Sequence, residues 1–109
     1  MNLDFASKDL REICETEKIA KKKLGAPAAK KLKSRLADII AAERVGDLKL
    51  GKPHPLKGDR LGQFSLTLHG GIRLVFDPLM EDVPTTEDGS IDWPEVTSVN
   101  ILFIGDYHD

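Results

Sequence analysis

The chain has 109 residues, of which 40% are hydrophobic and 31% are charged, and this size and composition suit one globular domain spanning residues 1–109. No segment reaches the roughly 20 consecutive apolar residues that a transmembrane helix needs. The first residues also lack the basic-then-apolar pattern of a secretion signal, so we expect a cytoplasmic protein with no membrane partner. The lone cysteine, Cys14, excludes an internal disulfide and a cysteine-built zinc site, and its apolar neighbours predict a buried small side chain.

The net charge of −2 conceals an uneven distribution along the chain. Residues 1–73 hold all 16 Lys and Arg and nine acidic residues, a balance of +7, whereas residues 74–109 hold nine acidic residues and neither Lys nor Arg. Clustered Lys and Arg favour binding to phosphate backbones, because binding releases condensed counterions. The first two thirds of the chain therefore have the charge balance of a polyanion-binding protein.

Residues 1–5 alternate weakly between polar and apolar side chains and predict a short edge strand. Ser7 stands where a helix N-cap would, and the helix that follows is expected to end at Gly25. Pro27 suits the first turn of a second helix, and we expect the two helices to form a hairpin. The second helix should bury an apolar stripe formed by Leu32, Leu36, Ile39 and Ile40.

Residues 46–62 contain four glycines, two prolines and several basic residues, which predicts a long functional loop. Alternating segments on both sides of His69-Gly70-Gly71 then predict a β-hairpin. A two-residue Gly-Gly turn would pair Leu68 with Arg73 and mix the faces. A three-residue turn that includes His69 pairs Leu68 with Ile72 and gives one apolar face, and this register is our prediction.

The stretch 77–95 holds seven acidic residues and three prolines, so we expect an exposed acidic connection with Trp93 as its anchor. Residues 96–105 are rich in β-branched and aromatic side chains and predict a last strand, which ends at Asp106, Tyr107 and His108. The order of elements predicts an α+β domain, with two N-terminal helices packed on one face of a small, twisted, mainly antiparallel sheet.

Several side chains have the chemistry that metal-independent RNA cleavage requires. That reaction needs a base for the ribose 2′-OH, cations near the phosphate and an acid for the leaving oxygen. Histidine exchanges protons near neutral pH, and tyrosine stacks on bases. The candidates are His54, His108, Lys57, Arg60, Arg73 and Tyr107.

Purely structural roles remain open for the same residues. A basic loop is often only solvated, the terminal Asp-Tyr-His sequence is compatible with a simple strand end, and Arg73 has Asp59 and Asp77 as possible ion-pair partners. The three histidines are too scattered to predict zinc coordination, so we expect no metal and no cofactor.

The ordered set of segments resembles the HigB branch of the RelE/ParE toxin superfamily. These segments are ICETEKIAKKKLG, HPLKGDR, GIRLVF, the acidic DGSIDW and the terminal DYH. The resemblance implies a RelE-like microbial ribonuclease fold and a toxin of a type II toxin–antitoxin system. It further implies ribosome-dependent mRNA cleavage through metal-independent attack of the 2′-OH, which inhibits translation.

The resemblance also implies site residues and partners. The implied catalytic positions are His54, Lys57, Asp106, Tyr107 and His108, and the implied phosphate-binding positions are Arg60 and Arg73. The implied partners are mRNA on the ribosome and a cognate antitoxin, expected to be a DNA-binding helix-turn-helix protein.

Two other functions fit the same pattern. One is a non-enzymatic poison of the ParE kind, which acts through its surface alone; the candidate proton carriers argue against it. The other is a regulatory protein that only pairs with a DNA-binding partner. Superfamily toxins are commonly basic, whereas this chain has a pI near 5.9. A basic RNA-binding surface therefore requires residues 77–95 to project away from it.

Overall fold

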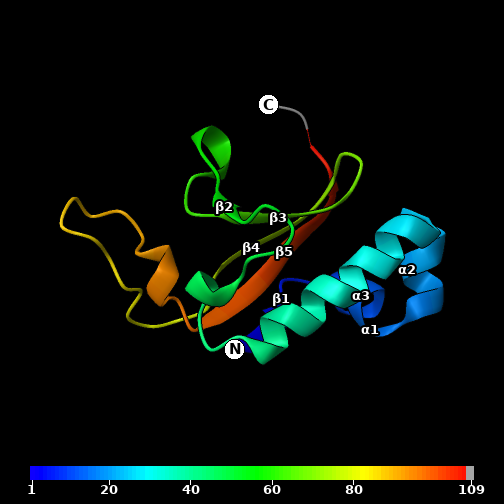
Figure 1. Ribbon diagram of the computed structural model, residues 1–109, viewed down its shortest axis with the longest axis horizontal. Helices are drawn as coiled ribbons and strands as arrows, with labels where there is room; N and C mark the ends of the chain where they lie inside the picture. Colours follow the sequence, from blue (N-terminus) through cyan, green and yellow to red (C-terminus); the bar gives the residue numbers. More distant parts are fainter. Residues whose placement is uncertain (108–109) are drawn as a thin grey trace.

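The computed structural model describes residues 1–107, in which three helices cover one face of a five-stranded sheet (Figure 1). The helices are α1 (Lys8–Glu15), α2 (Glu17–Leu24) and α3 (Ala26–Ala41). The strands are β1 (Asn2–Phe5), β2 (His54–Pro55), β3 (Phe64–His69), β4 (Ile72–Pro78) and β5 (Ser98–Asp106). Within residues 1–107 no helix is both long and apolar enough to cross a membrane. The predicted α+β class is confirmed.

The strands follow the order β1-β5-β4-β3-β2 across the sheet. β1 is parallel to β5, and the other neighbouring pairs are antiparallel. The sheet is therefore mainly antiparallel, as predicted, and the first strand lies at its edge. Three short 3-10 helices interrupt the connections: η1 (Val45–Asp47), η2 (Gly58–Arg60) and η3 (Trp93–Glu95).

The prediction of a single helix between Ser7 and Gly25 is wrong in one respect, because the structure divides this helix in two at Thr16. Ser7 caps α1 as expected, with its Oγ accepting a hydrogen bond from the backbone N–H of Leu10 at 3.2 Å. At Thr16 the backbone is extended, with φ −124° and ψ 107°, and threonine is a weak helix former that favours such end positions. The break lets α1 contact β1 and β5 while α2 packs against α3.

The third helix follows Gly25, whose φ of +86° suits a residue without a side chain, and Pro27 lies in its first turn as predicted. Ile39 is buried, but Ile40 is 62% exposed, which corrects the predicted apolar stripe. One residue turns the helix by about 100°, and this rotation carries Ile40 past the edge of the buried face.

Cys14 is half-buried rather than fully buried, which corrects a second prediction. Burial, with a smaller contribution from the neighbouring Glu15, raises the pKa of its thiol to about 12. Because the thiolate is the reactive form, Cys14 is a structural thiol at neutral pH and not a nucleophile.

The β3–β4 hairpin combines features of both registers considered from the sequence. Phe64 pairs with Phe76 and Leu66 pairs with Leu74, as predicted. The predicted three-residue turn is wrong, because His69 pairs with Ile72 across Gly70-Gly71 and a β-bulge interrupts the ladder between Thr67 and His69. The bulge adds one residue to β3, so a two-residue turn coexists with an apolar face.

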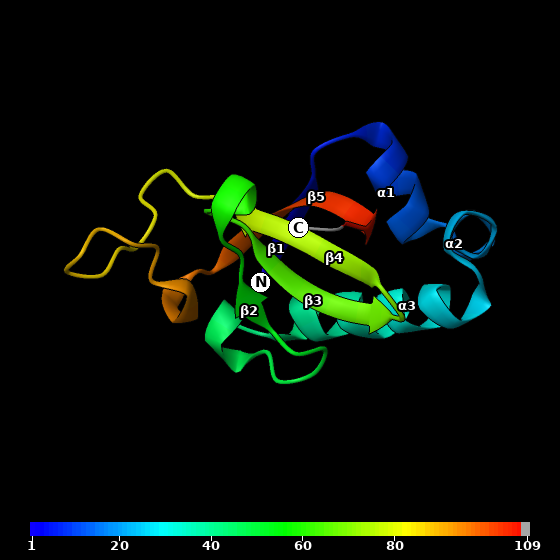
Figure 2. The ribbon, with the colours of Figure 1, turned by 90° about the horizontal axis from the view of Figure 1, so that it is seen from above.

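Trp93 fixes the acidic connection to the core, as predicted. Its side chain is 8% exposed, and its ring centroid lies 4.8 Å from that of Phe64 and 6.1 Å from that of Phe76. The rest of the connection extends beyond one end of the sheet, away from α2 (Figure 2). Most of residues 79–92 are exposed. The connection is therefore an arm that is anchored at its base.

We expect Trp93→Ala to lower the free energy of unfolding by about 3–5 kcal/mol, because it empties a buried aromatic site. Urea denaturation followed by circular dichroism measures this change. Leu61→Ala is the control, since Leu61 is 79% exposed and its truncation should cost less than about 0.5 kcal/mol. Equal unfolding free energies for the two variants would contradict the anchoring role.

Candidate functional site

The sheet face opposite the helices carries several of the predicted site residues. Strand pairing places His54, Ser65, Val75 and Phe103 in one row across β2, β3, β4 and β5. Thr67, Arg73 and Gly105 form the next row. Because cross-strand partners share a face, these rows alternate with buried residues such as Leu66 and Leu74, which face α3. We call this the open face because no helix of α1–α3 packs on it, and it is the candidate functional site.

The basic loop folds over the open face. Its backbone is tied down where the N–H of Leu56 donates to the carbonyl of Gln63 at 2.9 Å. Ser65 and Val75 lie on this face and are nevertheless 0% exposed, so the sheet is covered on this side too. Figure 1 shows η2 on the side of the sheet away from α3, and Figure 2 looks down on this side.

Arg60 contacts two aromatic rings at the centre of this site. Its guanidinium carbon is 4.7 Å from the ring centroid of Phe103 and 4.5 Å from that of Tyr107. Its Nη1 donates a hydrogen bond to Oε1 of Gln63 at 3.1 Å. The structure therefore brings the predicted residues Arg60 and Tyr107 together and orients the arginine before any ligand binds.

Tyr107 connects the end of β5 to β3. Its hydroxyl donates to Oγ of the buried Ser65 at 3.5 Å, and its ring packs edge-on against Phe103 with centroids 6.1 Å apart. Sequence reasoning missed Ser65, Gln63 and Phe103 as parts of this site. The two-residue period of β5 places Phe103 and Tyr107 on one face, and this signal was available in the sequence.

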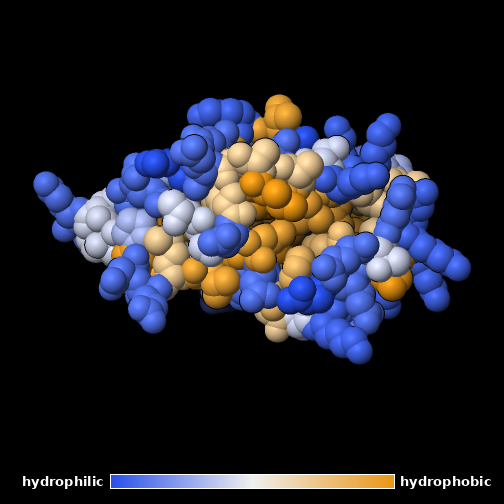
Figure 3. All heavy atoms as spheres, turned by 90° about the horizontal axis from the view of Figure 1, so that it is seen from below, coloured by the Kyte–Doolittle hydropathy of each residue, from blue (hydrophilic) through white to orange (hydrophobic). Residues whose placement is uncertain are grey.

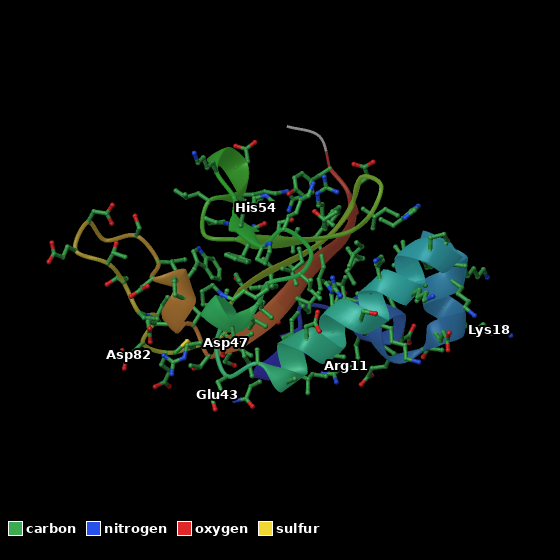
Figure 4. The ribbon with its side chains drawn as sticks, viewed as in Figure 1. Arg11, Lys18, Glu43, Asp47, His54 and Asp82 are labelled. Carbon is green, nitrogen blue, oxygen red and sulfur yellow. The ribbon has the colours of Figure 1, made fainter. Side chains whose placement is uncertain are left out.

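His54 is exposed on β2, on the same face and next to Ser65. Its Nδ1 lies 2.7 Å from the carbonyl oxygen of Lys52. A carbonyl only accepts hydrogen bonds, so Nδ1 carries the proton and Nε2 holds the lone pair when the ring is neutral. The exposed side chain of His54 is labelled in Figure 4. Lys57 is exposed just before η2.

Arg73 and Asp106 lie at the hairpin end of the sheet. Nη1 of Arg73 donates to the carbonyl of Gly70 at 3.0 Å, and within residues 1–107 it forms no ion pair with Asp59 or Asp77. The carboxylate of Asp106 occupies the space that a Cβ at Gly71 would need. His108, the remaining predicted site residue, lies outside the described part of the chain.

The acidic arm and the lysine-rich helix α2 lie at opposite ends of the molecule. Lys18 on α2 and Asp82 in the acidic arm lie at the two ends of the view in Figure 4, and the long axis measures 43 Å. Hydrogen bonds from Thr86 and Ser90 lower the pKa of Asp88 to about 2, so this carboxylate stays ionised at neutral pH. In the described part of the chain no group of three or more His, Cys, Asp or Glu side chains is arranged to share a metal ion.

Three helices on a five-stranded mixed sheet match the fold of YoeB/ParE-type toxins of known structure. The YoeB/ParE toxin from Agrobacterium tumefaciens matches with a TM-score of 0.59 and 17% identity over 99% of this chain and 100% of its own. The YoeB–YefM complex from Staphylococcus aureus matches with a TM-score of 0.57 and 17% identity, over 100% of this chain and 98% of the matched chain.

The YoeB dimer from Staphylococcus aureus gives a TM-score of 0.57 and 18% identity, again over 100% of this chain and 98% of its own. The sequence matches no family model and no curated protein. The shared feature is the fold, and placement in the HigB branch stays a prediction from the motifs.

Proposed function

We propose that this protein is the toxin of a type II toxin–antitoxin system and cleaves mRNA on the ribosome, thereby inhibiting translation. The observation that carries the proposal is the oriented Arg60, held against Phe103 and Tyr107 on the open face of a toxin-like fold. His54 on β2 and Lys57 before η2 are exposed. Phosphoryl chemistry needs cations for the phosphate and groups that transfer protons, and these residues are of both kinds.

The proposed reaction requires no metal. A base takes the proton of the ribose 2′-OH, the oxygen attacks the adjacent phosphorus, and the 5′ oxygen leaves with a proton from an acid. The products are a 2′,3′-cyclic phosphate and a 5′-OH. Nε2 of His54 suits the base, Lys57 and Arg60 stabilise the charge on the phosphate, and Arg73 contacts the RNA backbone.

Asp106, Tyr107 and His108, near the C-terminal end of the sequence, complete the proposal. Tyr107 stacks on a base next to the cleaved bond, and Asp106 and His108 take part in proton transfer, as the resemblance to HigB-like toxins implies. His54 and His108 are the two candidates for base and acid.

We expect His54→Ala and Lys57→Ala each to lower cleavage at least about 100-fold, the usual effect of losing a proton carrier or a phosphate contact. A reconstituted translation reaction with mapping of RNA 5′ ends measures it. Lys8→Ala, which removes an exposed lysine from α1, is the matched control and should cleave normally.

The same assay separates the alternative functions. Full-rate cleavage by both site variants would remove these residues from the mechanism. Growth arrest without new RNA ends in cells that make the wild-type protein would favour a ParE-like poison. If the wild-type protein causes neither growth arrest nor cleavage, the result would favour a regulatory protein that only pairs with a DNA-binding partner.

The acidic arm should oppose RNA binding from a distance. We expect the triple variant Glu81→Gln, Asp82→Asn, Glu87→Gln to bind a polyanionic RNA several-fold more tightly at about 0.01 M ionic strength, where charges act over about 30 Å. At about 0.15 M the change should vanish, because the Debye length falls to about 8 Å. Fluorescence anisotropy measures the affinity, and an equal change at both ionic strengths would contradict the long-range effect.

We also propose a cognate antitoxin partner with a DNA-binding helix-turn-helix domain, by analogy with the YoeB–YefM complexes. A groove of about 420 Å³ lies between β1, α1 and α3 and is lined by Leu3, Phe5, Leu36 and the exposed Ile40. Figure 3 shows an apolar hollow on one face of the molecule. The helices α2 and α3 carry several lysines, which favour an amphipathic, acidic antitoxin segment.

Ile40→Glu should therefore weaken antitoxin binding at least about tenfold, since it places a charge in an apolar contact. Co-expression with the protein encoded next to this gene, followed by copurification and calorimetry, measures the change. Leu61→Glu, on the covering loop, is the control and should bind normally. Equal affinities for both variants would place the antitoxin elsewhere.

A further inference from the structure

Two aromatic rings and one side-chain hydrogen bond orient the guanidinium of Arg60. Its Cζ lies 4.7 Å from the ring centroid of Phe103 and 4.5 Å from that of Tyr107, and a guanidinium carries five N–H donors. Gln63 accepts one hydrogen bond, from Nη1. Among residues 1–107 no carboxylate forms an ion pair with Arg60. The side chain is thus oriented while its charge is not neutralised by a salt bridge.

The position of the Phe103 ring depends in turn on Gly105. A Cβ at Gly105 would lie 3.0 Å from Cζ and 3.4 Å from Cε2 of Phe103, closer than ordinary van der Waals contact. The backbone at Gly105 does not have a positive φ, so the position needs glycine for space and not for conformation. The ring therefore lies over Gly105, on the side of β5 that carries Tyr107.

We infer that Phe103 and Gly105 are positioning residues that hold the Arg60 guanidinium ready to bind an RNA phosphate. This inference rests on the proposed function. A free arginine side chain loses rotamer entropy when it binds a phosphate, and a stacked one has lost most of it already. Phe103 lies within β5 and Tyr107 follows its end, so Phe103 is the fixed wall when Tyr107 turns to stack on a base. Neither Phe103 nor Gly105 touches the reacting atoms.

NMR tests the positioning without any activity measurement. In the wild type, ring currents should shift the Arg60 ¹⁵Nε–¹Hε resonance upfield. Phe103→Leu and Gly105→Ala should return it toward the value of an unstacked arginine, while Phe103→Tyr should preserve it. An unchanged resonance in both Phe103→Leu and Gly105→Ala would overturn the inference.

Cleavage kinetics on programmed ribosomes test the consequence. Phe103→Leu and Gly105→Ala should lower kcat at least about tenfold with a smaller change in KM, because misplacing a charged group weakens transition-state stabilisation. Phe103→Tyr should restore the rate. In an Arg60→Ala background, Phe103→Leu should not lower kcat further, since each of the two changes removes the same interaction between Arg60 and Phe103. An equal loss in both backgrounds would show that Phe103 acts independently of Arg60 and overturn the inference.

Two controls separate the possible failures. Val96→Ala truncates a fully buried residue beside η3 and should lower stability without lowering kcat, so loss of fold is distinguished from loss of positioning. Absence of cleavage by the wild type would contradict the proposed function alone. The inference is then decided by the NMR resonance and by the affinity for a 2′-deoxy RNA analogue, which Phe103→Leu should weaken several-fold; unchanged affinity would overturn it.

Discussion

Burial of β4 on both of its faces is the constraint on which the rest of the structure depends. Leu74, Val75 and Phe76 are consecutive and all 0% exposed, and consecutive side chains of a strand point to opposite faces. The helices cover Leu74 and Phe76, whereas Val75 lies outside the core that they cover. A second cover is therefore required, and the loop of residues 56–62 supplies it with the buried Leu56 as its apolar contact. The basic loop is held over the sheet because the strand beneath it must be kept from water.

This second cover explains why the candidate site is well ordered although it lies on a loop. Leu56 is buried and joined to Gln63 through the backbone, so the short segment between them has little freedom. Its one partly buried cation, Arg60, is turned toward the sheet by two rings, while Lys57 stays exposed. The loop thereby carries two kinds of positive charge, one held against aromatic rings and one exposed to solvent.

Local sequence signals predicted the elements whose structure depends on near neighbours. The Ser7 cap, the start of α3 at Pro27, the body of the hairpin and the Trp93 anchor follow from periodicity, capping and turn chemistry, and all are confirmed. The break at Thr16 and the bulge near Leu68 depend on how distant segments pack, so the local pattern did not reveal them. The same holds for the site: the period of β5 places Phe103 and Tyr107 on one face, but only the packing of the loop over the sheet brings Arg60 to them.

The separation of charge reconciles a net charge of −2 with a polyanion-binding surface. Electrostatic interactions in water at physiological ionic strength decay over about 8 Å, whereas the molecule is 43 Å long and carries its acidic arm at the end opposite α2. A phosphate near the lysines of α2 is therefore screened from the carboxylates of the arm. The base of the arm lies closer to the covering loop, because a Cβ at Gly62 would be 4.0 Å from Cδ1 of Ile91. Trp93, packed between Phe64 and Phe76, is what keeps the base of the arm at that end. The hydrophobic core thus sets the electrostatics of the site, because it determines where the acidic residues are placed.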